Sequence, residues 1–224
     1  MSIGIRTLEH LQDAMAKEFV WRRKELTRLK TMVIANQGGQ DRDLFIRASI
    51  PMLYAHWEGF VKKVGSLYLE YVARKKLRND ELPDAFLAMA IGRIVRRASE
   101  SSKVGTSLDV VNFFRSEMSK SSQLNWKNGV NTRSNLKASV FREIILSLGL
   151  SYVGFATKEK LIDEKLLANR NEIAHGEDCL VGHDEYIELH DQMLGIMQEL
   201  YDLIENSAVT EAYRRQPLAN PVPP

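Results

Sequence analysis

The sequence predicts an all-α protein, an elaborated bundle of long helices joined by short loops. Apolar residues recur at spacings of three and four over most of the chain, which is typical of amphipathic helices. No segment alternates apolar and polar residues as a half-buried strand would. The 224 residues are 44% hydrophobic, enough to bury a core. We therefore expect a single helical domain over residues 1–215.

Two long helices are predicted in the N-terminal part of the chain. The second is expected from Asp41 or Asp43 to about Lys76, after a turn at residues 36–39 that contains two glycines. Pro51 lies within this helix, and its missing N–H should kink the helix or split it in two. The first helix is expected over residues 7–35, because one stripe holds Leu8, Leu11, Met15, Phe19, Leu26, Leu29 and Val33.

Shorter helices are predicted over residues 84–98 and 107–118. The segment from Ser119 to Asn135 is rich in Ser, Asn, Lys and Gly, so we expect an exposed loop that could pair one short strand. Ser134 or Asn135 is expected to cap the next helix, which Gly149 should end.

The last two predicted helices lie within a strongly acidic part of the chain. Thr157 should cap one of them, and Gly176 stands where a left-handed C-cap residue is expected, so His175 should lie at the helix end. The final helix is expected over residues 184–213. Residues 216–224 include four prolines and are predicted to form a disordered tail.

Charge is distributed unevenly along the chain. The net charge is +2, but residues 161–205 contain twelve acidic residues and two basic ones, so the remainder carries +12. This asymmetry predicts either a basic surface for a polyanion or two parts that neutralise each other when packed.

The single cysteine, Cys179, excludes an intramolecular disulfide and a cysteine-based zinc site. The chain starts without a signal-like segment, and its apolar runs are too short to span a bilayer. We therefore expect a cytoplasmic protein without a membrane segment, and neither a cofactor nor a metal. His183 and His190, seven residues apart on one helical face, are a weak alternative metal pair.

The segment Arg170–Asn171–Glu172–Ile173–Ala174–His175 combines groups that can hold a phosphodiester and transfer a proton. Asn171 and His175 are four residues apart and share a helix face, whereas Arg170 and His175 are about 140° apart around a regular helix. The two can meet if the helix ends early, or if two copies meet across a twofold axis. Alternatively, Arg170 pairs with an acid such as Glu164, and His175 interacts with the terminal carbonyls of its helix.

This segment resembles the signature of the HEPN superfamily (higher eukaryotes and prokaryotes nucleotide-binding), an Arg and a His separated by four to six residues, commonly with Asn after the Arg. The segment Tyr54–Lys62 is similar to the second helix of a HEPN branch linked to prokaryotic toxins and phage defence. A third similarity runs from Asn131 to Gly149 and through the last helix to Tyr213.

The resemblance implies a metal-independent endoribonuclease that works as a homodimer. His175 would act as the base for the ribose 2′-hydroxyl or as the acid for the leaving oxygen. Arg170 would stabilise charge on the phosphorane oxygens, and Asn171 would orient His175 or the phosphate. The 2′-hydroxyl nucleophile implies RNA, for example tRNA. A toxin or defence effector would also have an antitoxin or defence-system partner protein.

Further residues are weaker candidates for the same site. Glu58, beside Trp57, could lie in the same cleft and pair with Arg170, although a solvated Glu is an equal alternative. Trp126 or Tyr152 could stack on bases. Basic clusters could follow an RNA backbone, or simply cover outer helix faces: Arg74, Lys75 and Lys76 with Arg78, and Arg93, Arg96 and Arg97.

The sequence is also compatible with two other functions. The same fold could serve as a non-catalytic module for dimerisation or for nucleotide or RNA binding. In a third reading, the acidic segment 161–205 makes the protein a helical adaptor for a basic partner protein, whose complex salt would weaken.

Overall fold

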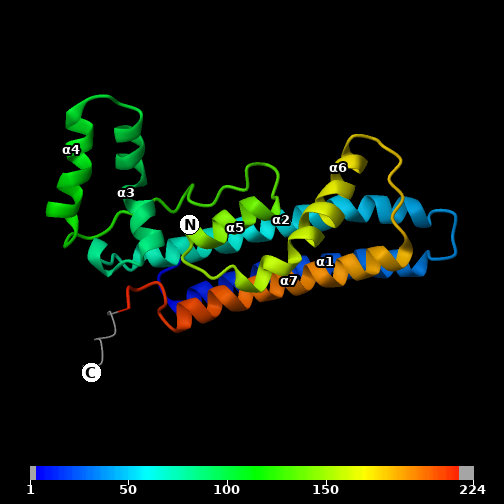
Figure 1. Ribbon diagram of the computed structural model, residues 1–224. Coiled ribbons are helices and arrows are strands. Elements are labelled where there is room, and N and C mark those ends of the chain that lie inside the picture. The colour runs from blue at the N-terminus through cyan, green and yellow to red at the C-terminus, as the bar shows by residue number, and fades with distance from the viewer. Residues whose placement is uncertain (1–3, 217–224) are drawn as a thin grey trace, which may run out of the picture.

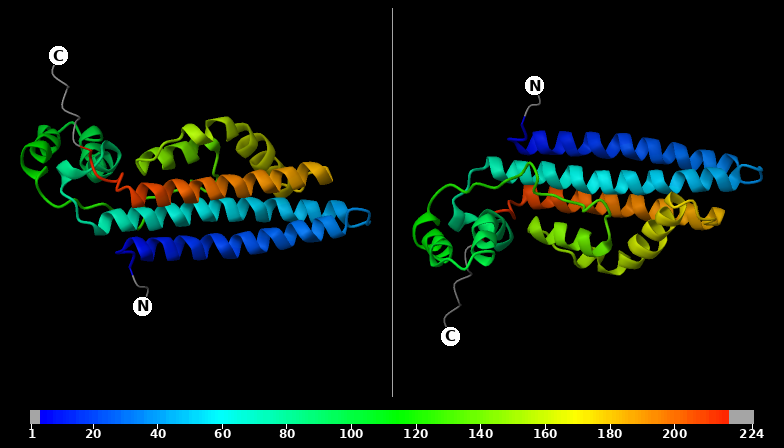
Figure 2. Two further views of the ribbon diagram at one scale, coloured as in Figure 1. Left: turned by 90° about the horizontal axis from the view of Figure 1, so that it is seen from below. Right: turned by 90° about the horizontal axis from the view of Figure 1, so that it is seen from above.

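The computed structural model describes residues 4–216 and shows seven α-helices in that range, with no β-strand (Figure 1). The all-α prediction is confirmed. Three long helices, α1 (Leu8–Ala35), α2 (Arg42–Arg74) and α7 (His183–Val209), pack against one another along their lengths. Helices α5 (Ala138–Ser147) and α6 (Ala168–Ala174) cover one side of this layer (Figure 2). The tail predicted for residues 216–224 lies, apart from Gln216, outside the described residues.

The first two helices begin and end close to their predicted bounds. The hydroxyl of Thr7 accepts a hydrogen bond from the His10 N–H (3.1 Å) and caps α1. Helix α2 continues through Pro51, so the prediction that the proline splits it is wrong. Helix α2 packs against α1 and α7, and Ile46 and Ile50 before the proline are buried in one cluster with Val33 of α1 and Tyr186 of α7. This packing holds the backbone helical despite the missing donor.

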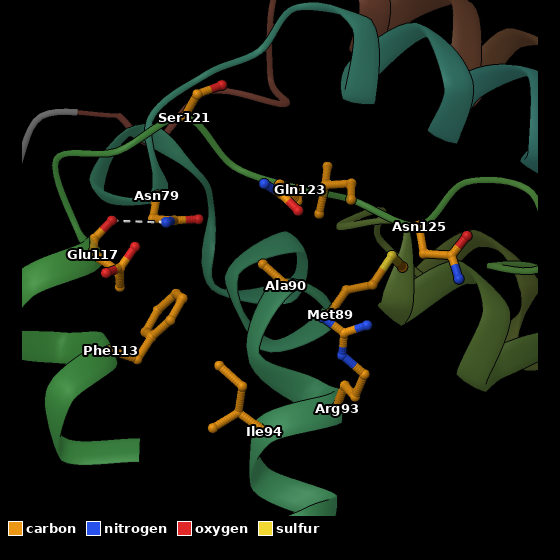
Figure 3. A pocket seen from close by; sticks show the side chains of 11 residues that line it. Asn79, Met89, Ala90, Arg93, Ile94, Phe113, Glu117, Ser121, Gln123 and Asn125 are labelled. Atoms are coloured by element: carbon orange, nitrogen blue, oxygen red, sulfur yellow. Dashed lines mark hydrogen bonds between the residues drawn. The ribbon is translucent and has the colours of Figure 1, made fainter. Parts of the chain in front are cut away.

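Helices α3 (Asp84–Ser99) and α4 (Val104–Asn112) form a hairpin that stands off one end of the long helices (Figure 1). A short 3₁₀ turn, η1 (Asn79–Glu81), leads into it, and a π-helical turn, η2 (Phe113–Glu117), follows it. The strand pairing considered for the following loop is limited to one bridge between Arg78 and Ser121. Between the hairpin and this loop lies a hollow, seen from close by in Figure 3.

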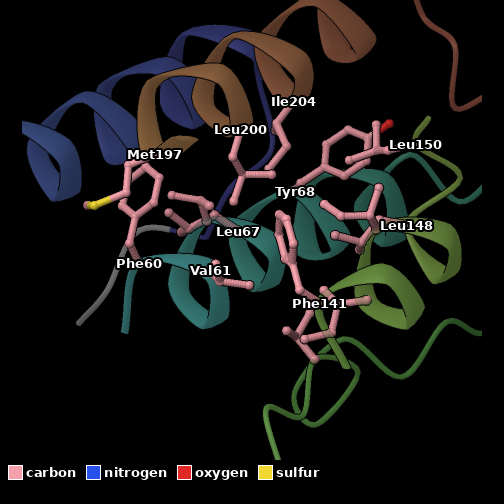
Figure 4. Packing of buried hydrophobic residues seen from close by; sticks show 14 of the residues in the cluster. Phe60, Val61, Leu67, Tyr68, Phe141, Leu148, Leu150, Met197, Leu200 and Ile204 are labelled. Atoms are coloured by element: carbon pink, nitrogen blue, oxygen red, sulfur yellow. The ribbon is translucent and has the colours of Figure 1, made fainter. Parts of the chain in front are cut away.

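The main core lies where α2, α5 and α7 meet, and Figure 4 shows apolar side chains from all three helices interdigitating there. Trp57 of α2 is fully buried and meets Phe141 of α5 edge-on, with ring centroids 4.9 Å apart. Such pairs add directional packing to the burial of large apolar side chains. Helix α5 is thereby fixed against the centre of α2.

The segment between α5 and α6 is helical but irregular, with a 3₁₀ stretch, η3 (Val153–Lys158), and a π-helical stretch, η4 (Leu161–Leu167). Thr157 therefore lies inside a helical turn and does not cap the motif helix as predicted. Ser134 and Asn135 do not cap α5 either. The carboxylate of Asp163 in η4 accepts a hydrogen bond from the Ala138 N–H (2.7 Å) in the first turn of α5. Asp163 therefore caps α5, although it lies 25 residues further along the chain.

None of the helices in residues 4–216 is long and apolar enough to cross a membrane.

Candidate active site

The Arg170–His175 segment forms helix α6 and its C-terminal cap. His175 is the C-cap, and Gly176 follows with a φ of +79°. The Gly176 N–H donates to the carbonyl of Ile173 (3.1 Å), and the Glu177 N–H donates to that of Glu172 (3.0 Å). This pair of bonds is a Schellman motif, which satisfies the last carbonyls and leaves His175 exposed at the helix end. The predicted C-cap at Gly176 is confirmed.

Gly176→Ala should destabilise the protein by about 1 kcal/mol, because a Cβ is strained in the left-handed conformation. Nothing lies within 4 Å of that Cβ position, so the cost is conformational and not steric. Gly195→Ala is the matched control, since Gly195 is an exposed α7 residue, also with open space around its Cβ position. It should be neutral or stabilising. Urea unfolding of both variants measures the difference; equal effects would contradict the role of Gly176 as the cap.

Arg170 lies on the side of α6 that faces α2. Its guanidinium carbon is 4.6 Å from the centroid of the Tyr54 ring, and its Nη1 donates to the Asn171 Oδ1 (2.7 Å). Within residues 4–216 no carboxylate lies within 4 Å of it, so the alternative of an ion pair with Glu164 is wrong. The guanidinium is thus held by an aromatic face and an amide, and its positive charge is not neutralised by a direct ion pair.

Tyr54 itself is fixed by the chain that packs over α2. Its hydroxyl accepts the backbone N–H of Leu136 (2.7 Å), and burial raises its pKa to about 12. The phenol is therefore neutral and serves as a rigid platform for Arg170. Tyr54 belongs to the segment that resembles HEPN proteins, but no role was predicted for it. Tyr54 and Glu58 are four residues apart and therefore share one face of α2, and this spacing could have indicated that Tyr54 also lies at the site.

Glu58 lies near this platform, but its partner is not the predicted one. Its Oε1 accepts a hydrogen bond from the hydroxyl of Thr132 (2.6 Å), and it makes no ion pair with Arg170. The predicted Glu58–Arg170 pair is therefore wrong. The half-buried carboxylate is satisfied by the loop before α5, which Tyr54 also holds through Leu136.

A second apolar cluster anchors the chain that follows His175. Cys179 is buried there with residues of α1, α2 and α7, and Ile173 of α6 packs against the same cluster. Arg47 of α2 donates to the carbonyl of Cys179 (3.1 Å). Burial raises the pKa of the Cys179 thiol. The exposed end of α6 is therefore fixed on both sides, although His175 itself points to solvent.

Within one chain Arg170 and His175 do not converge. The His175 N–H still donates to the carbonyl of Asn171 (2.9 Å), so the helical ladder continues to His175. The alternative that the helix ends early and lets the two side chains meet within one chain is therefore wrong. Five helical positions leave them about 140° apart around the axis. Asn171 is engaged by Arg170, not by His175.

The predicted RNA-binding residues lie at the other end of α2. Tyr54 and Arg74 are separated by about 30 Å along the helix, at a rise of 1.5 Å per residue. Arg74 pairs with Glu70 (2.7 Å), and the Lys75 ammonium lies 4.1 Å from the centroid of the Tyr71 ring. Lys76 is exposed. On α3, Arg93, Arg96 and Arg97 are exposed, and Arg97 pairs with Asp109.

The candidate stacking residues already have cationic neighbours. The Trp126 ring lies 5.6 Å from the guanidinium of Arg74, and Tyr152 is buried, 5.0 Å from that of Arg142. Tyr152 is therefore not available as a stacking face, whereas Trp126 is half-buried beside Arg74.

The acidic segment 161–205 is partly neutralised by bases from elsewhere in the chain. Lys30 pairs with Asp191 (2.7 Å), and Arg47 lies 3.8 Å from Asp178. Lys158 likewise pairs with Glu199. The uneven charge distribution is thus explained in part by packing. His190 is buried, 3.1 Å from the carbonyl of Leu26, and no group of three potential metal ligands occurs in residues 4–216.

Comparison with known families decides the class of this helical chain. The family model described as RiboL-PSP-HEPN matches residues 17–206, from within α1 to near the end of α7. The chain belongs to the RiboL-PSP-HEPN family. The match includes Tyr54, Glu58 and the whole of α6, so the HEPN resemblance read from the sequence is confirmed. No curated protein and no solved structure matched the chain.

Proposed function

We propose that this HEPN protein is a metal-independent endoribonuclease that cleaves RNA, such as tRNA, at a composite site in a homodimer. The observation that carries the proposal is an arginine without a carboxylate partner, held against Tyr54, on a helix that ends in an exposed histidine. Family membership supports a nucleotide- or RNA-related role. A cytoplasmic toxin or phage-defence effector, controlled by an antitoxin or a defence partner, would use such an activity.

Each motif residue has one task in the proposed reaction. His175 removes the proton of the ribose 2′-hydroxyl, and this oxygen attacks the adjacent phosphorus. The bond from phosphorus to the 5′-oxygen breaks, that oxygen takes a proton from water, and the protonated His175 returns its proton to solvent. Arg170 stabilises charge on the phosphorane oxygens through its fork of donors. Asn171 and Tyr54 hold the guanidinium in place.

The homodimer is proposed because one chain presents only half of this arrangement. Arg170 faces α2 while His175 lies at the end of α6, and the regular helix between them prevents their convergence. A twofold axis near the end of α6 would bring the histidine of one subunit to the arginine of the other. Each site would then take its base from one subunit and its arginine from the other.

The proposed chemistry can be tested with the wild-type protein and RNA in excess EDTA. Because the 2′-hydroxyl is the nucleophile, the products should carry 2′,3′-cyclic phosphate and 5′-hydroxyl ends. RNA with 2′-deoxy residues at the cleaved positions should remain intact, as should DNA. Gel analysis with end-group mapping measures this. Absence of cleavage with every structured RNA tried, or cleavage only after addition of a divalent metal, would favour the non-catalytic binding module or a different mechanism.

A further inference from the structure

A cavity of about 570 Å³ lies between the α3–α4 hairpin and the loop that follows it. Figure 3 shows α3 on one side of it, η2 on the other and the loop residues Gln123 and Asn125 across its top. Its volume falls within the roughly 300–1,000 Å³ of small-molecule sites. The cavity lies near the end of α2 that is opposite to Tyr54, so it is separate from the Arg170–His175 motif.

The polar group at the floor of this cavity is incompletely satisfied. Asn79 is 5% exposed, and its Nδ2 donates to the carbonyl of Glu117 (2.8 Å). Its Oδ1 has no hydrogen-bond donor among residues 4–216 and points away from Glu117 toward the Gln123 side of the cavity (Figure 3). A buried acceptor without a donor costs free energy, so the site favours a ligand that offers an N–H group there. The Gln123 amide beside it can both donate and accept.

The other walls suit a flat ring and an anion. The Phe113 ring forms one wall, and Met89 and Ile94 of α3 stand opposite it (Figure 3). Arg93 is exposed beside Asn125, and no carboxylate in the described part of the chain lies within 4 Å of it. A guanidinium without an anionic partner is suited to a phosphate. Glu117 lies at the opposite end of the cavity and already pairs with Lys120, so a phosphate is favoured only at the Arg93 end.

We propose that this cavity binds one nucleotide, with its base between Phe113 and the α3 wall and its phosphate on Arg93. A base edge would donate an N–H group to Asn79 Oδ1. A neighbouring hollow of about 410 Å³ shares Ser121, Gln123 and Leu124 with this cavity and is also lined by Arg74, Lys76 and Trp126. The nucleotide can therefore be a free mononucleotide or one unit of an RNA chain that continues into this hollow. The second source rests on the proposed RNA-directed function, and the first does not.

The test is a binding measurement on the full-length protein. Titration calorimetry with AMP, GMP, CMP and UMP probes the free nucleotide. Fluorescence anisotropy of a labelled single-stranded RNA octamer, with the His175→Ala protein to prevent cleavage, probes the chain. At least one probe should bind with a Kd below about 1 mM. Arg93→Ala should weaken its binding at least about tenfold, because a charge-assisted bond to phosphate is lost. Ala90→Phe should abolish it by filling the cavity.

Arg115→Ala is the matched control, because Arg115 is an exposed arginine on η2 that does not line the cavity. It removes the same charge and should change the Kd by less than about twofold. Selective weakening by Arg93→Ala with mononucleotides supports a free ligand, and the same pattern with the octamer alone supports an RNA unit. Absence of binding by both probes, or equal weakening by Arg93→Ala and Arg115→Ala, overturns the proposal. Both binding measurements are made without cleavage, so failure of this proposal can be told apart from failure of the proposed function.

Discussion

His175→Ala is expected to lower RNA cleavage by about 10²–10⁴-fold, the usual contribution of a positioned general acid or base. Its folding should be unchanged, because His175 is exposed and its backbone N–H, not its side chain, takes part in the helix cap. The initial rates at which the variant and the wild type cleave a labelled RNA are compared at equal dimer concentration, and the thermal unfolding of both proteins is measured in parallel.

His10→Ala is a suitable control for this variant. His10 is a histidine of α1, outside the motif helix, and its removal should leave cleavage within about twofold of wild type. If His175→Ala cuts RNA at the wild-type rate, the proposed proton transfer is wrong. If both variants lose activity together with stability, the loss reports folding, and a His175→Gln variant then separates the two effects.

Arg170→Ala is expected to lower cleavage by about 10²–10³-fold, the effect of removing one group that stabilises transition-state charge. The loss should appear mainly in kcat, since the interaction strengthens as charge develops on the phosphorane. Arg170→Lys should remain impaired, because an ammonium lacks the two-pronged donor geometry and is not held in the same way over Tyr54.

Removal of Arg170 should also have a measurable cost for folding. The contact between its guanidinium and the Tyr54 ring is worth about 0.5–2 kcal/mol, so urea unfolding should detect a modest decrease in stability. Tyr54→Leu provides the comparison, because it removes the aromatic face and keeps Arg170. It should lower kcat less than Arg170→Ala does. Wild-type cleavage by Arg170→Ala would exclude a role for the guanidinium in the reaction.

The parts of the site that depend on local sequence were predictable. Gly176 after His175 predicted the helix end, and the Schellman motif confirms it. The helix that carries the motif was predicted too, although its first part is the irregular η3 and η4. These features depend on residues within one or two helical turns of each other, so the sequence pattern contains them.

The contacts that could not be predicted from the sequence are those between residues far apart in the chain. The platform of Arg170 is Tyr54, 116 positions earlier, and the partner of Glu58 is Thr132 in a polar loop. Asp163 caps α5 from a neighbouring turn, and Pro51 is tolerated because two other helices pack beside it. Such contacts follow from tertiary packing, which periodicity and local propensity do not encode.

Mixing two inactive variants tests most directly whether Arg170 and His175 complete a site only across two subunits. Arg170→Ala and His175→Ala proteins, each inactive alone, are unfolded and refolded together and assayed for RNA cleavage. In a mixed dimer one subunit still supplies the arginine and the other the histidine. Random pairing makes about half of the dimers mixed. In a mixed dimer only one of the two sites contains both an arginine and a histidine, so about a quarter of wild-type activity should return. No recovery, with mixed dimers verified by mass spectrometry, would contradict the account.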